Sequence, residues 1–289
     1  MGKNLSYAEK IRALRPFDKY RDHKCNLTEQ EFRSSCGSAP VWHSVDLGDL
    51  FIEGARKTSE VTYNEMSRAK LPDLVGKSIL DIGAFGGWFS FEAERRGASE
   101  VVALDYHAWI TDWPKLRQHM NDEKSAGRIG NPYELPKHCV DFETLPGRGA
   151  FDATRRALGS QVKTAVCRFE DYNPGRTFDV VFFLGVLYHC KDPLGALEHI
   201  SRLTGDYLVL ETLGCHYPGL ENRSICDFFG DDRVNNDVTN WWAPNDKALT
   251  DMLLAVGFKH VEIKSSFDAL PEPLQKRPAA TRTWAHAWR

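Results

Sequence analysis

The sequence predicts an α/β fold built on a mostly parallel, seven-stranded sheet, and two observations carry this prediction. Short apolar runs alternate with helical segments from residue 75 onward, at the spacing that crossovers between parallel strands require. The last two runs follow one another without an obvious helix between them, which predicts a C-terminal antiparallel hairpin. Because buried parallel strands need cover on each side, helices are expected on both faces of this Rossmann-like sheet.

Each strand is predicted from its own apolar run. The five runs typical of buried parallel strands are Ser78–Ile82, Glu100–Leu104, Val162–Cys167, Phe178–Phe183 and Tyr207–Glu211. Two further strands are expected at Lys259–Lys264 and Arg282–Trp288, and they form the hairpin. A helix over Asn245–Val256 precedes them, and Gly257 supplies its C-cap.

The chain is expected to hold an N-terminal extension and one large domain. Residues 1–60 combine a charged helical pattern with a polar stretch, and we interpret them as a helical extension or lid on the domain of residues 61–289. Residues 106–159 are longer than a normal crossover, which predicts an insertion with a helix from Phe151 to Leu158. Residues 214–243 are expected to form a long loop.

Composition places the chain among ordinary globular proteins. It has 289 residues, 42% of them hydrophobic, with a net charge of −3 and no apolar run long enough to span a bilayer. Without a signal-peptide pattern, a cytoplasmic protein is expected, with no membrane partner. The seven cysteines are spread without a C-x-x-C pair, so we expect reduced thiols and no metal site. The sequence leaves open whether the chain forms a homo-oligomer.

A glycine-rich turn after the first apolar run carries the chemistry. Gly83, Gly86 and Gly87 allow a sharp bend and close approach of a ligand, and the following helix offers free amides at its N-terminus. Asp81 ends the strand before the turn, and Asp105 ends the next strand about twenty residues later. A carboxylate in this second position accepts the ribose hydroxyls of a nucleoside cofactor.

The glycine spacing separates two classes of nucleoside cofactor. A dinucleotide fingerprint requires G-x-G-x-x-G, whereas this turn has Gly83 followed by Gly86 and Gly87. Asp81 lies two residues before the first glycine, where an acid suits the cationic end of a methionine rather than a diphosphate. The sequence therefore predicts S-adenosylmethionine (SAM) as cofactor and disfavours an NAD-dependent oxidoreductase.

Several motifs of this chain together identify a family. They are Ile79–Gly83, Ala103–Asp105, Phe178–His189, Asp192–Leu194, Leu208–Leu213 and the helix Pro244–Phe258. These motifs resemble those of class I SAM-dependent methyltransferases, and more narrowly the tRNA wobble-uridine 5-oxyacetate (carboxymethyl) transferase-like group. The resemblance spans residues 70–265, and the Gly-Val-Leu-Tyr-His block with Asp-Pro-Leu after it is its most specific part. It implies a SAM-dependent methyltransferase.

The resemblance also implies which residues contact the cofactor. These are Asp81, Gly83, Ala84 and Gly87 in the turn, Asp105 and Tyr106 at the ribose, Phe169 and Glu170 at the adenine, and Leu184 and Tyr188 at the sulfonium. Gly83 would lie under the methionine moiety. An aromatic ring such as that of Tyr188 suits the sulfonium, which is a cation on an apolar body.

Three residues are candidates for catalysis: Tyr188, His189 and His216. His189 is predicted either to act as a general base for a hydroxyl acceptor or to orient a neighbour by a hydrogen bond. His216 follows the fifth strand, where acceptors bind in this architecture, and residues 214–243 would be the acceptor-side loop. Few catalytic groups are needed, because the sulfonium already activates the methyl group.

Departures from the family pattern bear on the acceptor. Phe85 replaces the usual second glycine, narrows the turn and places an aromatic ring near the cofactor. The basic residues that would grip a carboxylated SAM have no clear counterpart, since Arg56 and Lys57 lie out of pattern, although Arg282 is similar to a C-terminal arginine of the group. The absence of these basic residues favours plain SAM. Together with the acidic pI, it also favours transfer to an oxygen or nitrogen of a small molecule, such as a sugar or natural product. A tRNA wobble-uridine enzyme and a non-catalytic SAM-binding protein are the alternatives.

Overall fold

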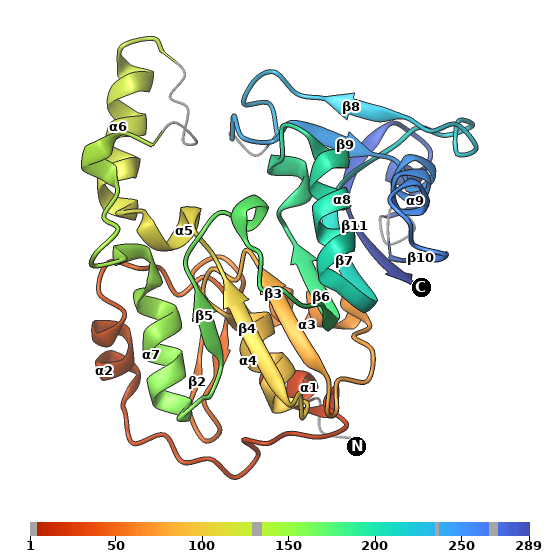
Figure 1. Ribbon diagram of the computed structural model, residues 1–289. Coiled ribbons are helices and arrows are strands. Elements are labelled where there is room, and N and C mark those ends of the chain that lie inside the picture. The colour runs from red at the N-terminus through yellow and green to blue at the C-terminus, as the bar shows by residue number, and fades with distance from the viewer. Residues whose placement is uncertain (1–4, 129–134, 235–236, 266–270) are drawn as a thin grey trace. The chain divides into compact units, whose positions relative to one another are not determined.

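A computed structural model describes residues 5–128, 135–234, 237–265 and 271–289 (Figure 1). Among these residues the chain divides into two compact units, the first ending at Phe169 and the second running from Glu170 to the C-terminus. The first unit holds the predicted extension together with the glycine-rich turn. The second holds the Tyr188–His189 block and the C-terminal strands.

Seven strands make up the predicted sheet. Their bounds are β3 Ser78–Ile82, β4 Glu100–Leu104, β5 Lys163–Ala165, β6 Phe178–Leu184, β7 Thr204–His216, β10 His260–Ser265 and β11 Ala279–Trp288. In the first unit β4 is parallel to both β3 and β5. In the second, β6 is parallel to β7, while β11 is antiparallel to β7 and to β10. The predicted fold class, including its antiparallel C-terminal end, is confirmed.

The helices of the first unit begin where the sequence supplies caps. Capping boxes at Ser6 and Thr28 start α1 (Tyr7–Ala13) and α2 (Glu29–Ser35). The remaining elements are β1 Val45–Asp46, β2 Phe51–Ile52, α3 Ser59–Ala69, α4 Trp88–Arg95, α5 His107–Ile110, α6 Trp113–Ser125, η1 Lys137–Cys139, η2 Pro146–Arg148 and α7 Gly149–Leu158. Helix α4 packs against β3 and β4, and α7 confirms the helix expected over residues 151–158.

A buried ion network fastens the N-terminal segment to α4. Arg15 donates to Glu92 of α4 at 2.9 Å and to Asp46 at 2.6 Å, and all three side chains are almost inaccessible to solvent. Beside them, Arg95 of α4 donates to Asp18 at 2.9 Å. Buried charges are tolerated only when each one is paired. The described residues before β1, from Leu5 onward, are therefore packed into the first unit.

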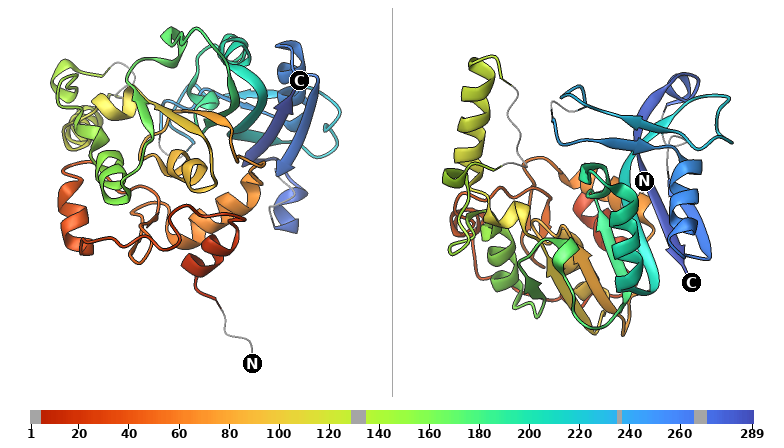
Figure 2. Two further views of the ribbon diagram at one scale, coloured as in Figure 1. Left: turned by 60° about the horizontal axis from the view of Figure 1, so that its bottom comes forward. Right: turned by 45° about the horizontal axis from the view of Figure 1, so that its top comes forward.

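In the second unit, side-chain caps again set the helix starts. Asp192 and Asn245 accept hydrogen bonds from the first turns of the two helices that follow them. The elements are η4 Leu187–His189, α8 Pro193–Leu203, β8 Cys226–Phe228, β9 Trp242–Pro244, α9 Asp246–Ala255 and α10 Glu272–Gln275. Helix α8 packs against β6 and β7, and α9 packs against β10. Strands β8 and β9 pair as a separate antiparallel ribbon (Figure 2).

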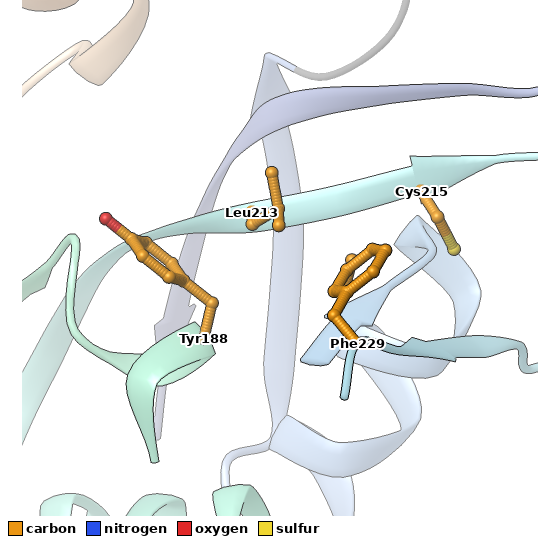
Figure 3. Packing of buried hydrophobic residues seen from close by; sticks show 5 residues of the cluster. Tyr188, Leu213, Cys215 and Phe229 are labelled. Carbon is orange, nitrogen blue, oxygen red and sulfur yellow. The ribbon is translucent and has the colours of Figure 1, made fainter. Parts of the chain in front are cut away.

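A small core joins η4 to β7 and to the β8–β9 ribbon. Its buried members are Tyr188, Leu213, Cys215, Phe229 and Ala243. Figure 3 shows Tyr188 of η4 and Phe229 lying along β7, beside Leu213 and Cys215. The backbone amide of Trp241 donates to the carbonyl of Tyr188 at 2.8 Å, which adds a polar tie to this packing. The core therefore fixes the position of the motif that carries Tyr188.

Strand β7 is longer than the sequence predicts. The apolar run ends at Glu211, but β7 continues to His216 and pairs with β11 from Tyr207–Trp288 to His216–Ala279. Pairing with β11 satisfies backbone groups beyond the apolar run, so the polar residues there are still buried in the strand. The predicted loop 214–243 consequently contains the end of β7, all of β8 and the start of β9.

None of the helices in the described ranges is both long enough and apolar enough to cross a bilayer.

All seven cysteines carry free thiols, and three of them are buried. Burial raises the pKa of the Cys215 thiol to about 12, so this group stays protonated at neutral pH.

Replacing Arg15 by Ala is expected to lower the free energy of unfolding by about 2–3 kcal/mol, because Glu92 and Asp46 lose their shared cation while buried. The loss falls below the usual range for a broken buried pair, since Arg96 still contacts Glu92 and Arg12 still contacts Asp46. Urea unfolding followed by circular dichroism measures the change.

The exposed Arg21 supplies the matched control, and Arg21→Ala is expected to change the free energy of unfolding by less than about 0.5 kcal/mol. Proteolysis should also cleave the Arg15→Ala protein faster before residue 50, because the network no longer holds this segment. Equal stability of the two variants would contradict a structural role for the network.

Candidate active site

The turn after β3 bends sharply because three of its residues adopt positive φ. These are Gly83 at 77°, Phe85 at 48° and Gly87 at 76°. Glycine enters this region freely, whereas other residues do so rarely. The amides of Gly83 and Ala84 donate to the carbonyl of Leu104, at 2.8 and 3.1 Å. The predicted turn contacts Gly83, Ala84 and Gly87 thus lie in one loop beside the end of β4.

Packing also requires glycine at position 87. A Cβ on Gly87 would lie 2.4 Å from the ring of Phe151 and 2.7 Å from that of Phe91. At Gly86, by contrast, no atom lies within 4 Å of the Cβ position. The turn is therefore tightly packed at one glycine and open at its neighbour, which leaves room for a ligand to approach the backbone.

Asp81 is a buried carboxylate at the end of β3. Only 3% of its surface is exposed, and its Oδ2 accepts a hydrogen bond from Ser90 at 2.5 Å. Burial, together with the negative charge of Asp105, raises the pKa of Asp81 to about 7. A carboxylate with this pKa gains most from a cationic partner, because the partner replaces the solvation that burial removes. The ammonium group of a methionine moiety is such a partner.

Asp105 braces the turn from the end of β4. Its Oδ2 accepts from the amide of Phe85 and its Oδ1 accepts from the amide of Ala108, both at 2.9 Å. Burial raises the pKa of Asp105 to about 6, although these amide bonds oppose the rise. Each carboxylate oxygen has a second lone pair, so a ribose hydroxyl can still be accepted. The ribose role of Asp105 stays a prediction.

Aromatic side chains surround Phe85 at the same place. Its ring centroid lies 5.4 Å from that of Trp42 and 5.6 Å from that of Trp113, and Trp109 donates from Nε1 to its carbonyl at 2.7 Å. The sequence predicts the aromatic residue at 85 but not the three tryptophans. Trp109 and Trp113 are signalled only by the density of tryptophan after Asp105, and Trp42 lies outside that stretch. An apolar aromatic wall beside two buried carboxylates suits a sulfonium cofactor.

The other predicted cofactor contacts are divided between the two units. Tyr106 precedes α5, with its ring 5.9 Å from that of Phe142. Half-buried Phe169 ends the first unit, and exposed Glu170 begins the second. Leu184 is half-buried at the end of β6. Their roles toward one cofactor remain predictions.

Tyr188 lies in a polar cluster of the second unit. The guanidinium of Arg282 lies 4.5 Å above the ring centroid of Tyr188, and its Nη1 is 3.3 Å from Glu211 Oε1. Burial raises the pKa of Tyr188 to about 12, so its hydroxyl stays protonated at neutral pH. Gly185 of the Gly-Val-Leu-Tyr-His motif has a φ of 74°, which favours glycine at this position.

The two candidate histidines occupy different surroundings. His189 lies beside Tyr188, with ring centroids 4.1 Å apart, and its Nδ1 contacts Thr239. His216 is the last residue of β7, is 4% exposed, and its Nε2 lies 2.9 Å from the carbonyl of Gln275. The structure thus brings Tyr188 and His189 together, and it ties His216 to the end of α10. A catalytic role for His216 remains a prediction.

The methyltransferase-domain family model matches residues 58–263. The chain belongs to this family. The matched range includes the turn with Asp81, Asp105 at the end of β4, and the Tyr188–His189 block. The prediction of a SAM-dependent methyltransferase with SAM as its cofactor is confirmed.

The curated relatives of this methyltransferase include tRNA U34 carboxymethyltransferases. A tRNA U34 carboxymethyltransferase from Alteromonas mediterranea is 25% identical over 193 residues, which is 66% of this chain and 47% of the relative. One from Psychromonas ingrahamii is 28% identical over 281 residues, which is 89% of this chain and 72% of the relative. The chain spans about half the length of the first of these relatives.

Solved methyltransferase structures resemble the chain at low sequence identity. The N-terminal domain of EvdMO1 with SAH bound is 14% identical, with complete coverage of both chains and a TM-score of 0.48. An O-methyltransferase family protein from Burkholderia thailandensis is also 14% identical, over 79% of this chain and 56% of that chain, with a TM-score of 0.48.

Gly87→Ala is expected to destabilise the protein by about 2–4 kcal/mol, because its new Cβ overlaps two phenylalanine rings and its positive φ is strained. Gly86→Ala is the matched control, and we expect a loss below about 1 kcal/mol because its Cβ position is open. Thermal unfolding of both variants measures the difference. Tolerance of alanine at 87 would show that the turn is not packed as described.

Asp81→Asn is expected to stabilise the ligand-free protein at high pH and to weaken SAM binding. The pKa of Asp81 rises on folding from 3.8 to about 7, so the folded protein holds an extra proton between these values. Stability is therefore lost as pH rises from 4 toward 7, and asparagine, which never ionises, avoids this loss. The melting temperature should rise more near pH 8 than near pH 4.5.

Asp22→Asn is the control for this pH comparison, because the Asp22 carboxylate lies in water on the surface of the same unit. Its melting temperature should match that of the unmodified protein at both pH values. An Asp81→Asn protein that melts at the same temperature as the unmodified protein near pH 8 would mean that ionised Asp81 is not strained.

Proposed function

We propose that this methyltransferase transfers the methyl group of SAM to an oxygen or nitrogen atom of a small-molecule acceptor, such as a sugar or natural product. The observation that supports binding of SAM is the pair of buried carboxylates, Asp81 and Asp105, beside a glycine turn that is open at Gly86. When bound, SAM supplies an activated methyl group. The contribution of the chain is to bind and orient the cofactor and to align the acceptor.

Surface charge supports a small acceptor over RNA. Residues 214–243, the predicted acceptor side, contain five acidic and two basic residues. Arg233, one of the two basic residues, is paired with Asp231 at 2.6 Å. Binding to nucleic acid depends on cations that neutralise phosphates, so an acidic segment disfavours an RNA backbone. A neutral or cationic small molecule meets no such repulsion.

A tRNA wobble-uridine methyl or carboxymethyl transferase is the second candidate, because the curated relatives carry that name. A carboxylated SAM would need cations to bind its extra carboxylate. Lys57 is paired with Glu65, and the guanidinium of Arg56 lies 5.7 Å from the Trp42 ring centroid. Arg282 is a further cation, but it already contacts Glu211. These pairings favour plain SAM.

A non-catalytic SAM-binding protein is a third possibility, since methyl transfer requires few diagnostic side chains. It would share the cofactor cradle of an enzyme but yield no methylated product. Cytoplasmic location and self-association of the chain remain predictions.

Isothermal titration calorimetry with SAM, carboxylated SAM and NAD tests the cofactor assignment. We expect binding of SAM in preference to the other two. Asp105→Ala should weaken SAM binding by ~1–3 kcal/mol through loss of hydrogen bonds to the turn and ribose. Asp22→Ala, on the exposed surface, should leave the affinity unchanged.

Mass spectrometry of sugars, natural products and tRNA incubated with SAM then tests the acceptor. Methylated small molecules are the expected products. Binding of NAD alone would contradict the cofactor assignment, and modification of tRNA alone would establish the second candidate. Tight SAM binding with no product from any acceptor would favour the non-catalytic alternative.

A further inference from the structure

A chain of hydrogen bonds in the second unit fixes the ring of His189. Its Nδ1 lies 2.9 Å from the carbonyl oxygen of Thr239 and 2.8 Å from the hydroxyl oxygen of the same residue. The Thr239 hydroxyl donates to Asp237 Oδ1 at 2.6 Å. A histidine is thereby linked through a threonine to a carboxylate.

These contacts determine which nitrogen of His189 carries the proton. A carbonyl oxygen can only accept a hydrogen bond, so Nδ1 must be the donor to Thr239. The Thr239 hydroxyl gives its own proton to Asp237, so it too can only accept from Nδ1. In the neutral ring, Nε2 then holds the lone pair. This is the tautomer that a general base at Nε2 requires.

The turn that carries Thr239 and Asp237 is held in place by further hydrogen bonds. The Asn240 side chain donates to the carbonyls of Val234 and Asp237, each at 3.0 Å. Asp237 Oδ1 also accepts from the amide of Thr239 at 2.9 Å. Thr239 is 4% exposed and Asn240 is 2% exposed. The contacts to His189 are therefore built into the fold of this unit.

Burial favours the neutral form of the His189 ring. It lowers the pKa of His189, and Arg282 of β11 acts in the same direction, whereas the Thr239 carbonyl and the charge of Asp237 oppose the shift. Tyr188 on η4 stays protonated, and Glu211 on β7 is paired with Arg282. His189 as a whole residue is half-buried.

We propose that His189 is a general base for an acceptor hydroxyl, that Thr239 and Asp237 are its positioning residues, and that the acceptor is therefore an alcohol or a phenol. This inference rests on the proposed methyl transfer and narrows it to oxygen. An amine attacks with a lone pair that it already has, whereas a neutral hydroxyl is a weak nucleophile until its proton is removed.

The reaction balances with the groups named. The hydroxyl proton of the acceptor passes to Nε2 of His189 while the acceptor oxygen forms a bond to the methyl carbon. The bond between that carbon and sulfur breaks, and its electron pair stays on sulfur. The products are a methyl ether, S-adenosylhomocysteine and a protonated His189, which returns its proton to water.

Nitrogen NMR of histidine-labelled protein tests the positioning without any substrate. Long-range nitrogen–proton correlations near pH 8 should show His189 with its proton on Nδ1, and His189→Gln assigns the signal by removing it. Thr239→Val should weaken this preference, Thr239→Ser should restore it, and Thr250→Val should leave it unchanged, since that hydroxyl bonds only the carbonyl of Asp246 within α9. A proton on Nε2 in the unmodified protein would overturn the proposal.

Methylation of a graded panel of phenols and matched anilines tests the chemistry. We expect methyl ethers from the phenols. His189→Gln should lower kcat by about 10²–10⁴-fold for weakly acidic phenols, with KM nearly unchanged. The loss should be much smaller for para-nitrophenol, which ionises without help. Asp237→Asn should lower kcat about tenfold and move the ascending limb of the pH profile to lower pH, because its charge raises the pKa of His189.

The outcomes separate this inference from the proposed function. Methylation of anilines alone, or an equal loss across all phenols in His189→Gln, would overturn the role of His189 while leaving methyl transfer in place. Absence of any methyl ether from protein that binds SAM in calorimetry would also overturn it. Failure to bind SAM would instead remove the proposed function itself.

Discussion

The first unit's site depends on how Phe85 is held at positive φ. Its amide donates to Asp105 and its carbonyl accepts from Trp109, so side chains that follow β4 satisfy both backbone groups of the one strained residue in the turn. A residue other than glycine in this region costs about 1–3 kcal/mol and persists only where its surroundings determine it. Asp105 therefore acts first on the protein's own backbone. Any contact with a ribose is an addition to that structural role.

The electrostatics of the turn follow from the same arrangement. Asp105 is buried where it accepts hydrogen bonds from backbone amides. Its negative charge raises the pKa of Asp81, which is itself almost completely buried. Both pKa values rise, which means that the ligand-free site holds carboxylates that are costly to ionise. A bound cation removes part of that cost. If the cofactor binds at this pair as proposed, its binding and the stability of the protein are coupled through the two carboxylates, and both should then depend on pH.

How much of the fold the sequence could predict depended on how local the signal was. Strands β3 and β4 were found at their observed bounds, because unbroken apolar runs mark strands buried on both faces. Strand β7 was found only in part, since Glu211, Thr212 and His216 are polar and yet buried. Their burial comes from pairing with β11, which lies about seventy residues away in the chain. A long-range pairing of this kind has no local pattern.

The same distinction applies to the candidate site. Tyr188 and His189 could be selected from a motif, whereas the residues that orient His189 could not, because Thr239 lies fifty residues further along the chain. One of the two contacts to Nδ1 comes from a backbone carbonyl, which every residue possesses, and the other comes from the Thr239 hydroxyl. The side chain at position 239 does not indicate that the carbonyl of the same residue will contact Nδ1 of His189. Only the fold of the β8–β9 region brings the two atoms together. The candidate side chains Tyr188 and His189 can therefore be selected from sequence, whereas the proton position proposed for His189 depends on contacts that only the fold supplies.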